Sequence, residues 1–195
     1  MPEGGGHRNA LPLYQIRNAR ILYDFAPAMP LRVSALRSLG AYMNIFSIES
    51  FMDELAQASE TDPVDFLRHL DDPRARDVIT AAAERFGWSR FPRKQGSGRG
   101  FAFARYKNLG AYAAVAVEVS LDHESGRVRL VRAAASVDSG QAVNPDAIRN
   151  QIEGGHSPIC ELDALRKHHH RPDAHHEPRL EQLSDPALFG GAGFG

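Results

Sequence analysis

Metal-binding side chains gather near the C-terminal end of the sequence. Most of the nine histidines and the single cysteine lie there, among them His168, His169, His170, His175, His176 and Cys160. A structural zinc or nickel site also needs a scaffold that fixes its ligands in a defined geometry. No Cys-x-x-Cys pair and no regular periodicity supplies one in this segment. We therefore expect weak adventitious metal binding at most, and we assign no metal site.

A glycine-rich segment, Gly-Ser-Gly-Arg-Gly over residues 96–100, would let an anion approach the backbone closely. It lacks the Lys-Ser/Thr ending of a nucleoside triphosphate loop. It also precedes a predicted strand, whereas a dinucleotide fingerprint runs from strand to loop to helix. We interpret it as a linker into residues 101–106.

Further candidate residues lie at the ends of two predicted helices. Arg37 could hold a carboxylate or a developing negative charge, although a surface arginine is the simpler interpretation from the sequence alone. Gly40, Ala41 and Asn44 lie at a turn into a helix, where bare N–H groups could meet a phosphate or could simply be capped. Gln151 carries an amide that can donate and accept at once.

The remaining polar and aromatic candidates have structural interpretations. We read Asp138 as a turn carboxylate rather than a base, because Ser139 and Gly140 follow it. Glu49 and Glu118 are expected to be solvated or paired structural charges. Trp88, Phe91 and the other aromatic residues are expected in the core.

These residues need helices to position them. Apolar residues recur every three or four positions over residues 41–59 and predict one helical face: Ile45, Ile48, Phe51, Met52 and Leu55. Asp53, Glu54 and Gln57 would face water. Asp-Pro pairs at 62–63 and 72–73 predict two further helix starts. The second of these helices would bury Val78, Ile79, Ala82 and Phe86 and end at Gly87.

Strand-forming residues dominate the second half of the sequence. Residues 113–121 and 127–132 flank the turn residues 122–126 and predict a β-hairpin. Residues 20–25 also have the composition of a short strand. Asn144 and Pro145 signal another helix, with Ile148 and Ile152 on one face. The order of elements predicts an α+β fold in which a helical segment is followed by a hairpin and a helix.

The amino-acid composition limits which partners the protein could bind and where in the cell it could lie. The chain has 195 residues, 43% of them hydrophobic, with 23 basic and 24 acidic side chains and a net charge of -1. This balance argues against nucleic acid as a partner. The single cysteine cannot form an internal disulfide, which favours the cytoplasm. The sequence shows no secretory signal and no apolar run of about 20 residues, so we expect no membrane span. We expect a cytoplasmic location, or periplasmic export as part of a complex.

Four blocks of the sequence keep a common order and spacing with a known family. They resemble the molybdopterin-binding large subunits of the xanthine dehydrogenase/aldehyde oxidase family, especially the isoquinoline 1-oxidoreductase and aldehyde dehydrogenase branch. The blocks are residues 36–56, 62–76, 98–108 and 137–155. The likeness covers roughly residues 10–155 and implies part of a larger molybdenum-cofactor-binding domain.

The resemblance implies a molybdopterin cofactor, often in its cytosine dinucleotide form. It also implies oxidation of a small aldehyde or aromatic N-heterocycle with water as the oxygen source, the metal carrying the chemistry. Electrons would leave through an iron–sulfur small subunit. The family's catalytic glutamate lies in a Gly-x-Gly-Glu motif near the end of the large subunit. We therefore assign no catalytic residue here and expect the chain alone to be inactive.

The resemblance also gives roles to particular residues. Arg37 matches the family arginine on the substrate side of the molybdenum site. The cofactor-binding candidates are Gly40, Ala41, Asn150, Gln151 and Gly154. We predict three segments: a flexible N-terminus (1–12), a partial cofactor-binding domain (13–155) and a disordered tail (156–195).

The tail has the features of a shifted reading frame. With suitable codons, dropping one base from the stretch encoding residues 155–165 gives Gly-Ile-Leu-Gln-Ser-Val-Ser-Trp-Thr-Leu, which resembles the family's continuation. We hold this frameshift as a hypothesis.

Two other hypotheses stay open. The chain could be a non-catalytic interaction module with a His-rich tail, or one part of a split enzyme completed by a separately encoded N-terminal chain. Neighbouring codons for the missing half and a gene for an iron–sulfur subunit would favour an enzyme fragment. Activity that appears only on co-expression would favour a split enzyme.

Sequencing the coding DNA tests the frameshift hypothesis. We expect codons after Gly155 that read as family-like sequence in the shifted frame. Codon third positions incompatible with that reading would contradict it.

Overall fold

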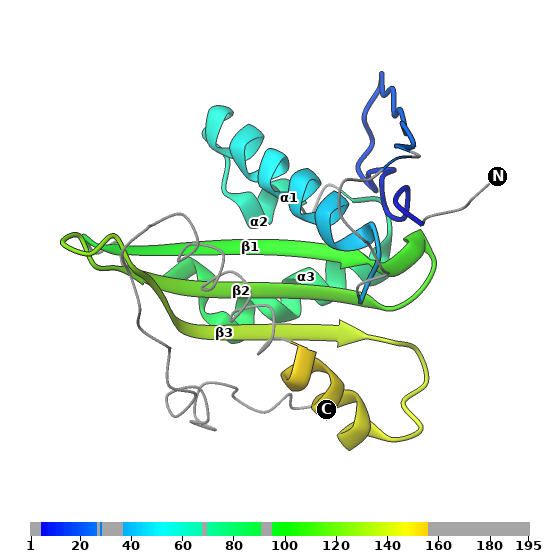
Figure 1. Ribbon diagram of the computed structural model, residues 1–195. Helices are drawn as coiled ribbons and strands as arrows, with labels where there is room; N and C mark the ends of the chain where they lie inside the picture. Colours follow the sequence, from blue (N-terminus) through cyan, green and yellow to red (C-terminus); the bar gives the residue numbers. More distant parts are fainter. Residues whose placement is uncertain (1–4, 27, 29–36, 68–69, 91–94, 156–195) are drawn as a thin grey trace.

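The computed structural model describes residues 5–26, 28, 37–67, 70–90 and 95–155. Three α-helices precede three strands, and a further helix covers residues 145–155 (Figure 1). The elements are α1 (Ala41–Ala58), α2 (Pro63–Leu67), α3 (Pro73–Phe86), η1 (Trp88–Arg90), β1 (Ser97–Arg105), η2 (Tyr106–Asn108), β2 (Tyr112–Leu121) and β3 (Val128–Asp138). The predicted α+β class is confirmed.

The strands form one antiparallel sheet in the order β1-β2-β3. The predicted hairpin is β2 and β3, with Asp122 accepting a hydrogen bond from the Ser125 hydroxyl in its turn. The linker expected over residues 96–100 is wrong, because Ser97–Arg105 is strand β1 and pairs along β2. Glycine fits there beside large neighbours: a Cβ at Gly98 would lie 3.4 Å from Val119 Cγ2.

One hydrophobic core lies between α3 and the sheet, where the helix crosses behind β2 and β3 (Figure 1). The predicted inner face of α3 is confirmed, since all four of its apolar residues are buried: Val78, Ile79, Ala82 and Phe86. Trp88 also lies in this core, as predicted, and its indole N–H donates to Asp62. Phe91 lies outside the described residues.

The helix ends follow the sequence signals. Asp62 accepts from the Val64 N–H at 2.9 Å, and Asp72 accepts from the Arg74 N–H at 3.0 Å. Gly87 ends α3 with φ 71°, a left-handed conformation that glycine adopts without side-chain strain. Residues 20–25, expected as a short strand, are exposed and have no regular structure.

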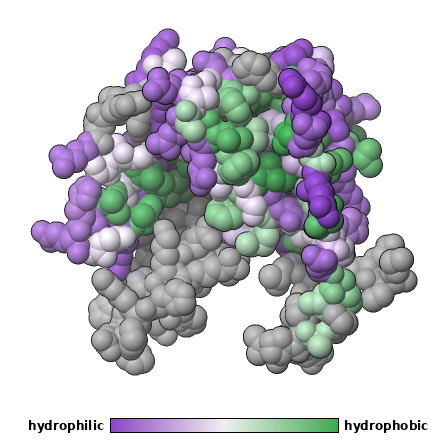
Figure 2. Space-filling view, turned by 90° about the horizontal axis from the view of Figure 1, so that it is seen from above, coloured by the Kyte–Doolittle hydropathy of each residue, from purple (hydrophilic) through white to green (hydrophobic). Residues whose placement is uncertain are grey.

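Helix α1 lies along the β1 edge rather than over the sheet (Figure 1). Met52 and Ala56 are buried, but Phe51 is 56% exposed and Leu55 is 38% exposed. The predicted face was therefore too wide, because a helix at a strand edge is covered along a narrow stripe only. Figure 2 views the molecule from this side and shows apolar surface among hydrophilic groups.

The His-rich and Cys160-containing tail lies outside the described residues, so its disorder and shifted frame stay predictions. The predicted segment boundaries also stay predictions. Within the described part of the chain, no helix is long and apolar enough to cross a membrane.

Ile79 provides a test of the core, because its side chain is 0% exposed between α3 and the sheet. We expect Ile79→Ala to lower the free energy of unfolding by about 2–5 kcal/mol, through lost burial and the cavity left behind. Val143→Ala is the control, since Val143 is 90% exposed. Urea unfolding followed by circular dichroism measures both, and equal effects would contradict this packing.

Candidate functional site

The predicted substrate residue and the predicted cofactor helix meet in space. Arg37 is exposed, and a Cβ built on Gly155 would lie 3.8 Å from its Nη2 atom. Gln151 precedes Gly155 by four residues in the same helix and so lies on the same face. The structure therefore brings Arg37 to the side of the helix that carries Gln151.

The turn between Arg37 and α1 has an unusual backbone. Ser38 and Leu39 have φ values of 72° and 53°, so both adopt the left-handed conformation that non-glycine residues rarely take. Such a residue costs on the order of 1–3 kcal/mol, and it persists where surrounding contacts fix it. These contacts come from the N-terminal residues of the chain.

Residues 5–8 cover the N-terminus of α1. The Gly40 N–H donates to the Gly5 carbonyl at 3.3 Å, and a Cβ at Gly40 would lie 2.2 Å from the Gly6 oxygen. The Asn44 amide donates to the carbonyls of Gly6 and Arg8 at 2.8 and 2.9 Å. Close packing of this segment thus explains why position 40 holds glycine.

The predicted cofactor residues fall into two groups. Gly40 is partly covered and Ala41 is only 4% exposed, both beneath the N-terminal segment. Asn150, Gln151 and Gly154 are exposed on the helix over 145–155. The second group can therefore reach a ligand within this chain's own structure. The assigned roles stay predictions.

Asn9 fixes the same N-terminal segment to the end of β1. It is 5% exposed, and its amide donates to the Arg105 carbonyl and the Asn108 side chain, both at 2.9 Å. Its side-chain oxygen accepts from the Lys107 N–H at 2.8 Å. Asn108 in turn donates to the Leu11 carbonyl. This segment was expected to be flexible, and its contacts were not predicted.

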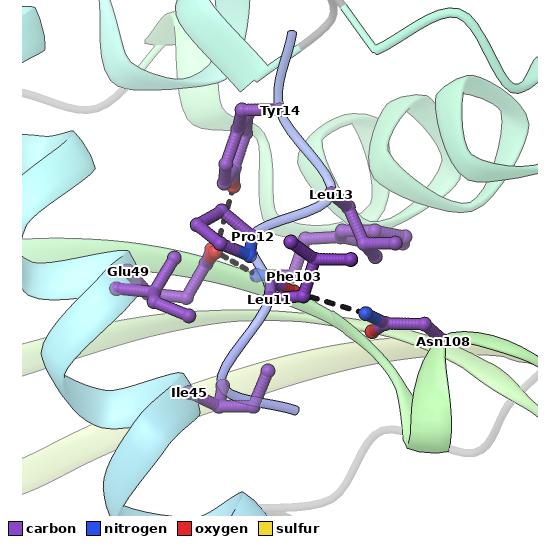
Figure 3. A pocket seen from close by; sticks show the side chains of 9 residues that line it. Leu11, Pro12, Leu13, Tyr14, Ile45, Glu49, Phe103 and Asn108 are labelled. Atoms are coloured by element: carbon purple, nitrogen blue, oxygen red, sulfur yellow. Dashed lines mark hydrogen bonds between the residues drawn. The ribbon is translucent and has the colours of Figure 1, made fainter. Parts of the chain in front are cut away.

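Glu49 was expected to be a solvated or paired structural charge, and its burial was not predicted. The solvated alternative is wrong, because the side chain is 8% exposed and joins three distant segments (Figure 3). The Tyr14 hydroxyl donates to Oε1 at 2.7 Å, and the Phe103 N–H donates to Oε2 at 2.8 Å. The sequence did contain a signal for its burial. Glu49 lies in a series with Ile45, Met52 and Ala56 at intervals of three or four residues, which places it on the same helical face as these apolar residues.

Burial changes the acid–base behaviour of this cluster. Removal from water raises the pKa of Glu49 to about 7, although the hydrogen bonds from Tyr14 and Phe103 act in the opposite direction. Burial raises the pKa of the Tyr14 hydroxyl, and the nearby Glu49 charge adds to this effect. With a pKa of about 7, the Glu49 carboxyl group changes its protonation state near neutral pH.

The hollow beside Glu49 does not have the size of a substrate site. It is bordered mainly by apolar groups of the N-terminal segment, α1 and β1: Leu11, Pro12, Leu13, Tyr14, Ile45, Ile48, Glu49, Phe103 and Asn108 (Figure 3). Its cavity volume is about 10 Å³, which is room for about one water molecule. Small-molecule sites are commonly about 300 Å³ or larger. We therefore assign Glu49 a structural role.

The other carboxylates also have structural partners. Asp138 pairs with Arg74 at 2.8 Å and accepts the Gly140 N–H, as predicted for a turn residue. The hydrogen bond from Arg74 lowers the pKa of Asp138, which makes it a poor base near neutral pH. Glu118 pairs with Arg132 at 2.6 Å, which confirms the predicted paired charge.

Comparison with known proteins gives the family. A profile of the molybdopterin cofactor-binding domain matches residues 47–157, which span α1 to the helix over 145–155. The chain belongs to this family. Its match begins within α1 and ends where the predicted tail begins.

Two similar proteins are subunits of enzymes. The chain is 38% identical to a subunit of the nicotinate dehydrogenase of Pseudomonas putida, over 76% of this chain and 14% of the relative. It is 33% identical to the beta subunit of the isoquinoline 1-oxidoreductase of Brevundimonas diminuta, over 66% of this chain and 17% of the relative. The chain thus spans less than a fifth of the length of either relative.

The exposed residues fit part of a cofactor cradle. Arg37 offers a guanidinium, and Asn150 and Gln151 offer amides, which suit the oxygen and nitrogen atoms of a phosphate or pterin. Within the described residues, no cluster of His, Cys, Asp or Glu could hold a metal ion directly. The amide and guanidinium donors suit the organic part of a molybdopterin.

The raised pKa of Glu49 predicts a pH dependence of stability. The folded-state pKa of about 7 exceeds the ordinary value of 4.5, so the native state holds the proton more tightly. The contribution is complete below pH 4.5 and is lost as the pH rises towards 7. The loss is at most about 3 kcal/mol, from 1.36 kcal/mol per pKa unit.

Glu49→Gln should flatten this dependence, because an amide keeps a donor and an acceptor but carries no charge. Urea unfolding at a series of pH values measures the slope. Glu54→Gln is the matched control, since Glu54 is exposed on the same helix. A Glu49→Gln protein that loses as much stability as the wild type over this range would refute the assignment.

Proposed function

We propose that the chain forms part of a molybdenum hydroxylase that oxidises an aromatic N-heterocycle or an aldehyde, with water as the oxygen source. The observation that carries the proposal is the meeting of Arg37 with the helix over 145–155. The names of the two relatives support the substrate class, because nicotinate and isoquinoline are both aromatic N-heterocycles. Nicotinate also carries a carboxylate that a guanidinium can bind.

In this proposal each exposed residue has a positioning role. Arg37 holds a negative charge on the substrate side, where its planar group can make two parallel hydrogen bonds. Asn150 and Gln151 bind polar atoms of the cofactor, and Gly154 leaves room for it. The molybdopterin, in its cytosine dinucleotide form, supplies the redox and oxygen-transfer chemistry when bound.

The proposal assigns catalysis to an assembled subunit and not to these residues alone. The chain covers only 14% of its nicotinate dehydrogenase relative, and its sequence contains no Gly-x-Gly-Glu motif. An iron–sulfur small subunit would accept the electrons. We expect the purified chain neither to bind the cofactor tightly nor to turn over an aldehyde or N-heterocycle.

A chimeric subunit tests the proposal. Residues 5–155, which include the N-terminal contacts to the turn after Arg37, replace the matching segment of the Pseudomonas putida nicotinate dehydrogenase relative, which is expressed with its partner subunits and assayed with nicotinate. We expect activity in the chimera, and Arg37→Ala should lower kcat/KM by about 10²–10³-fold, as for other lost charge-stabilising donors.

Arg20→Ala is the control, because Arg20 is also exposed and carries no role in the proposal. Arg37→Lys keeps the charge and should retain part of the activity. An Arg37→Ala chimera as active as the Arg20→Ala chimera would refute the assigned role. Turnover by the purified chain alone would overturn the assignment of catalysis to the assembled subunit.

A further inference from the structure

The two faces of the sheet differ in an unexpected way. The face toward α3 holds the buried residues Tyr112, Ala114 and Ala116, with charged side chains such as Glu118 and Arg132 paired at its margin. In a sheet with one solvated face, the opposite face would alternate to polar residues. Here the opposite face is apolar throughout the paired register.

We call this second surface the valine face. Because directly paired residues share a face, the register defines its members: Gly98, Gly100, Ala102, Ala104, Ala113, Val115, Val117, Val119, Leu121, Val128, Leu130, Ala133, Ala135 and Val137. None of them is buried, and Leu121 and Val128 are the most exposed. The labelled helices do not cover it, since α3 packs behind the sheet and α1 lies at the β1 edge (Figure 1).

The side chains of the valine face differ in size, so its surface is ridged. Val115, Val117 and Val119 form a ridge along β2. Opposite them on β1 lie Gly100 and Ala102, and on β3 lie Ala133 and Ala135, so most of the ridge is flanked by smaller side chains. No side chain on this face can form a hydrogen bond or carry a charge. A partner must therefore be apolar and must place larger side chains on either side of the ridge.

We propose that the valine face is an internal docking surface, covered by an apolar helix or sheet layer from the remainder of the molybdopterin-binding subunit. The extent of the chain supports this occupant, because it represents 14% and 17% of the lengths of its two relatives. A sheet that is apolar on both faces is the middle layer of a three-layer arrangement. This inference rests on family membership and not on the proposed reaction.

Thiol labelling of the full chain tests the proposal without cofactor or activity. Cys160, the single cysteine, is replaced by serine, and Val117→Cys places one thiol on the valine face. The probe is the Pseudomonas putida nicotinate dehydrogenase relative from which the segment matching this chain has been removed, co-expressed with the full chain. Val143→Cys is the matched control, because Val143 is 90% exposed and lies outside the sheet.

We expect the Val117→Cys thiol to react with a maleimide at least about tenfold more slowly in the co-expressed sample than in the chain alone, as for a site that must open before it reacts. The Val143→Cys rate should not change. Circular dichroism of each variant checks that the chain remains folded.

Three outcomes would overturn the proposal. Equal Val117→Cys rates with and without the truncated relative would show that the remainder does not cover the face. Protection in the chain alone that grows with concentration would identify a second copy as the occupant. Protection that is independent of concentration and of the truncated relative would show that the chain covers the face itself.

Discussion

A single buried carboxylate holds together parts of the chain that are far apart in sequence. Glu49 accepts a hydrogen bond from Tyr14 in the N-terminal segment and another from the Phe103 N–H on the outer edge of β1. An edge N–H buried without a partner would cost about 1–3 kcal/mol, so the carboxylate both caps the sheet edge and fixes α1 beside it. The position of α1, and hence of the turn before it, depends on this contact.

Two sets of hydrogen bonds stabilise the turn between Arg37 and α1. Asn44 and Gly40 bind the carbonyls of residues 5–8, and Asn9 ties the same segment to the end of β1. Such a network can maintain the left-handed backbone at Ser38 and Leu39, which is unfavourable in isolation. The exposed Arg37 lies directly before this supported turn, and support of this kind is what its proposed binding role requires.

The two faces of the sheet differ in what covers them within the described residues. Its inner face packs on α3 in the way of any two-layer fold, and this side alone supplies the core. Its outer valine face carries no polar residue, although nothing in the local strand geometry prevents one. The proposed cover from the remainder of a longer subunit would give a physical reason, since the relatives are several times longer than this chain.

The sequence by itself determined the local features. Asp62, Asp72 and Gly87 set helix ends through backbone bonds within a few residues, and the blocks that resemble the molybdenum hydroxylases identified the family. The buried state of Glu49 was decided only by the tertiary structure, because its partners lie 35 and 54 residues away. The exposed faces of α1 and β2 were likewise decided by packing. Periodicity shows that a face is apolar, but only the neighbouring elements determine whether it is covered.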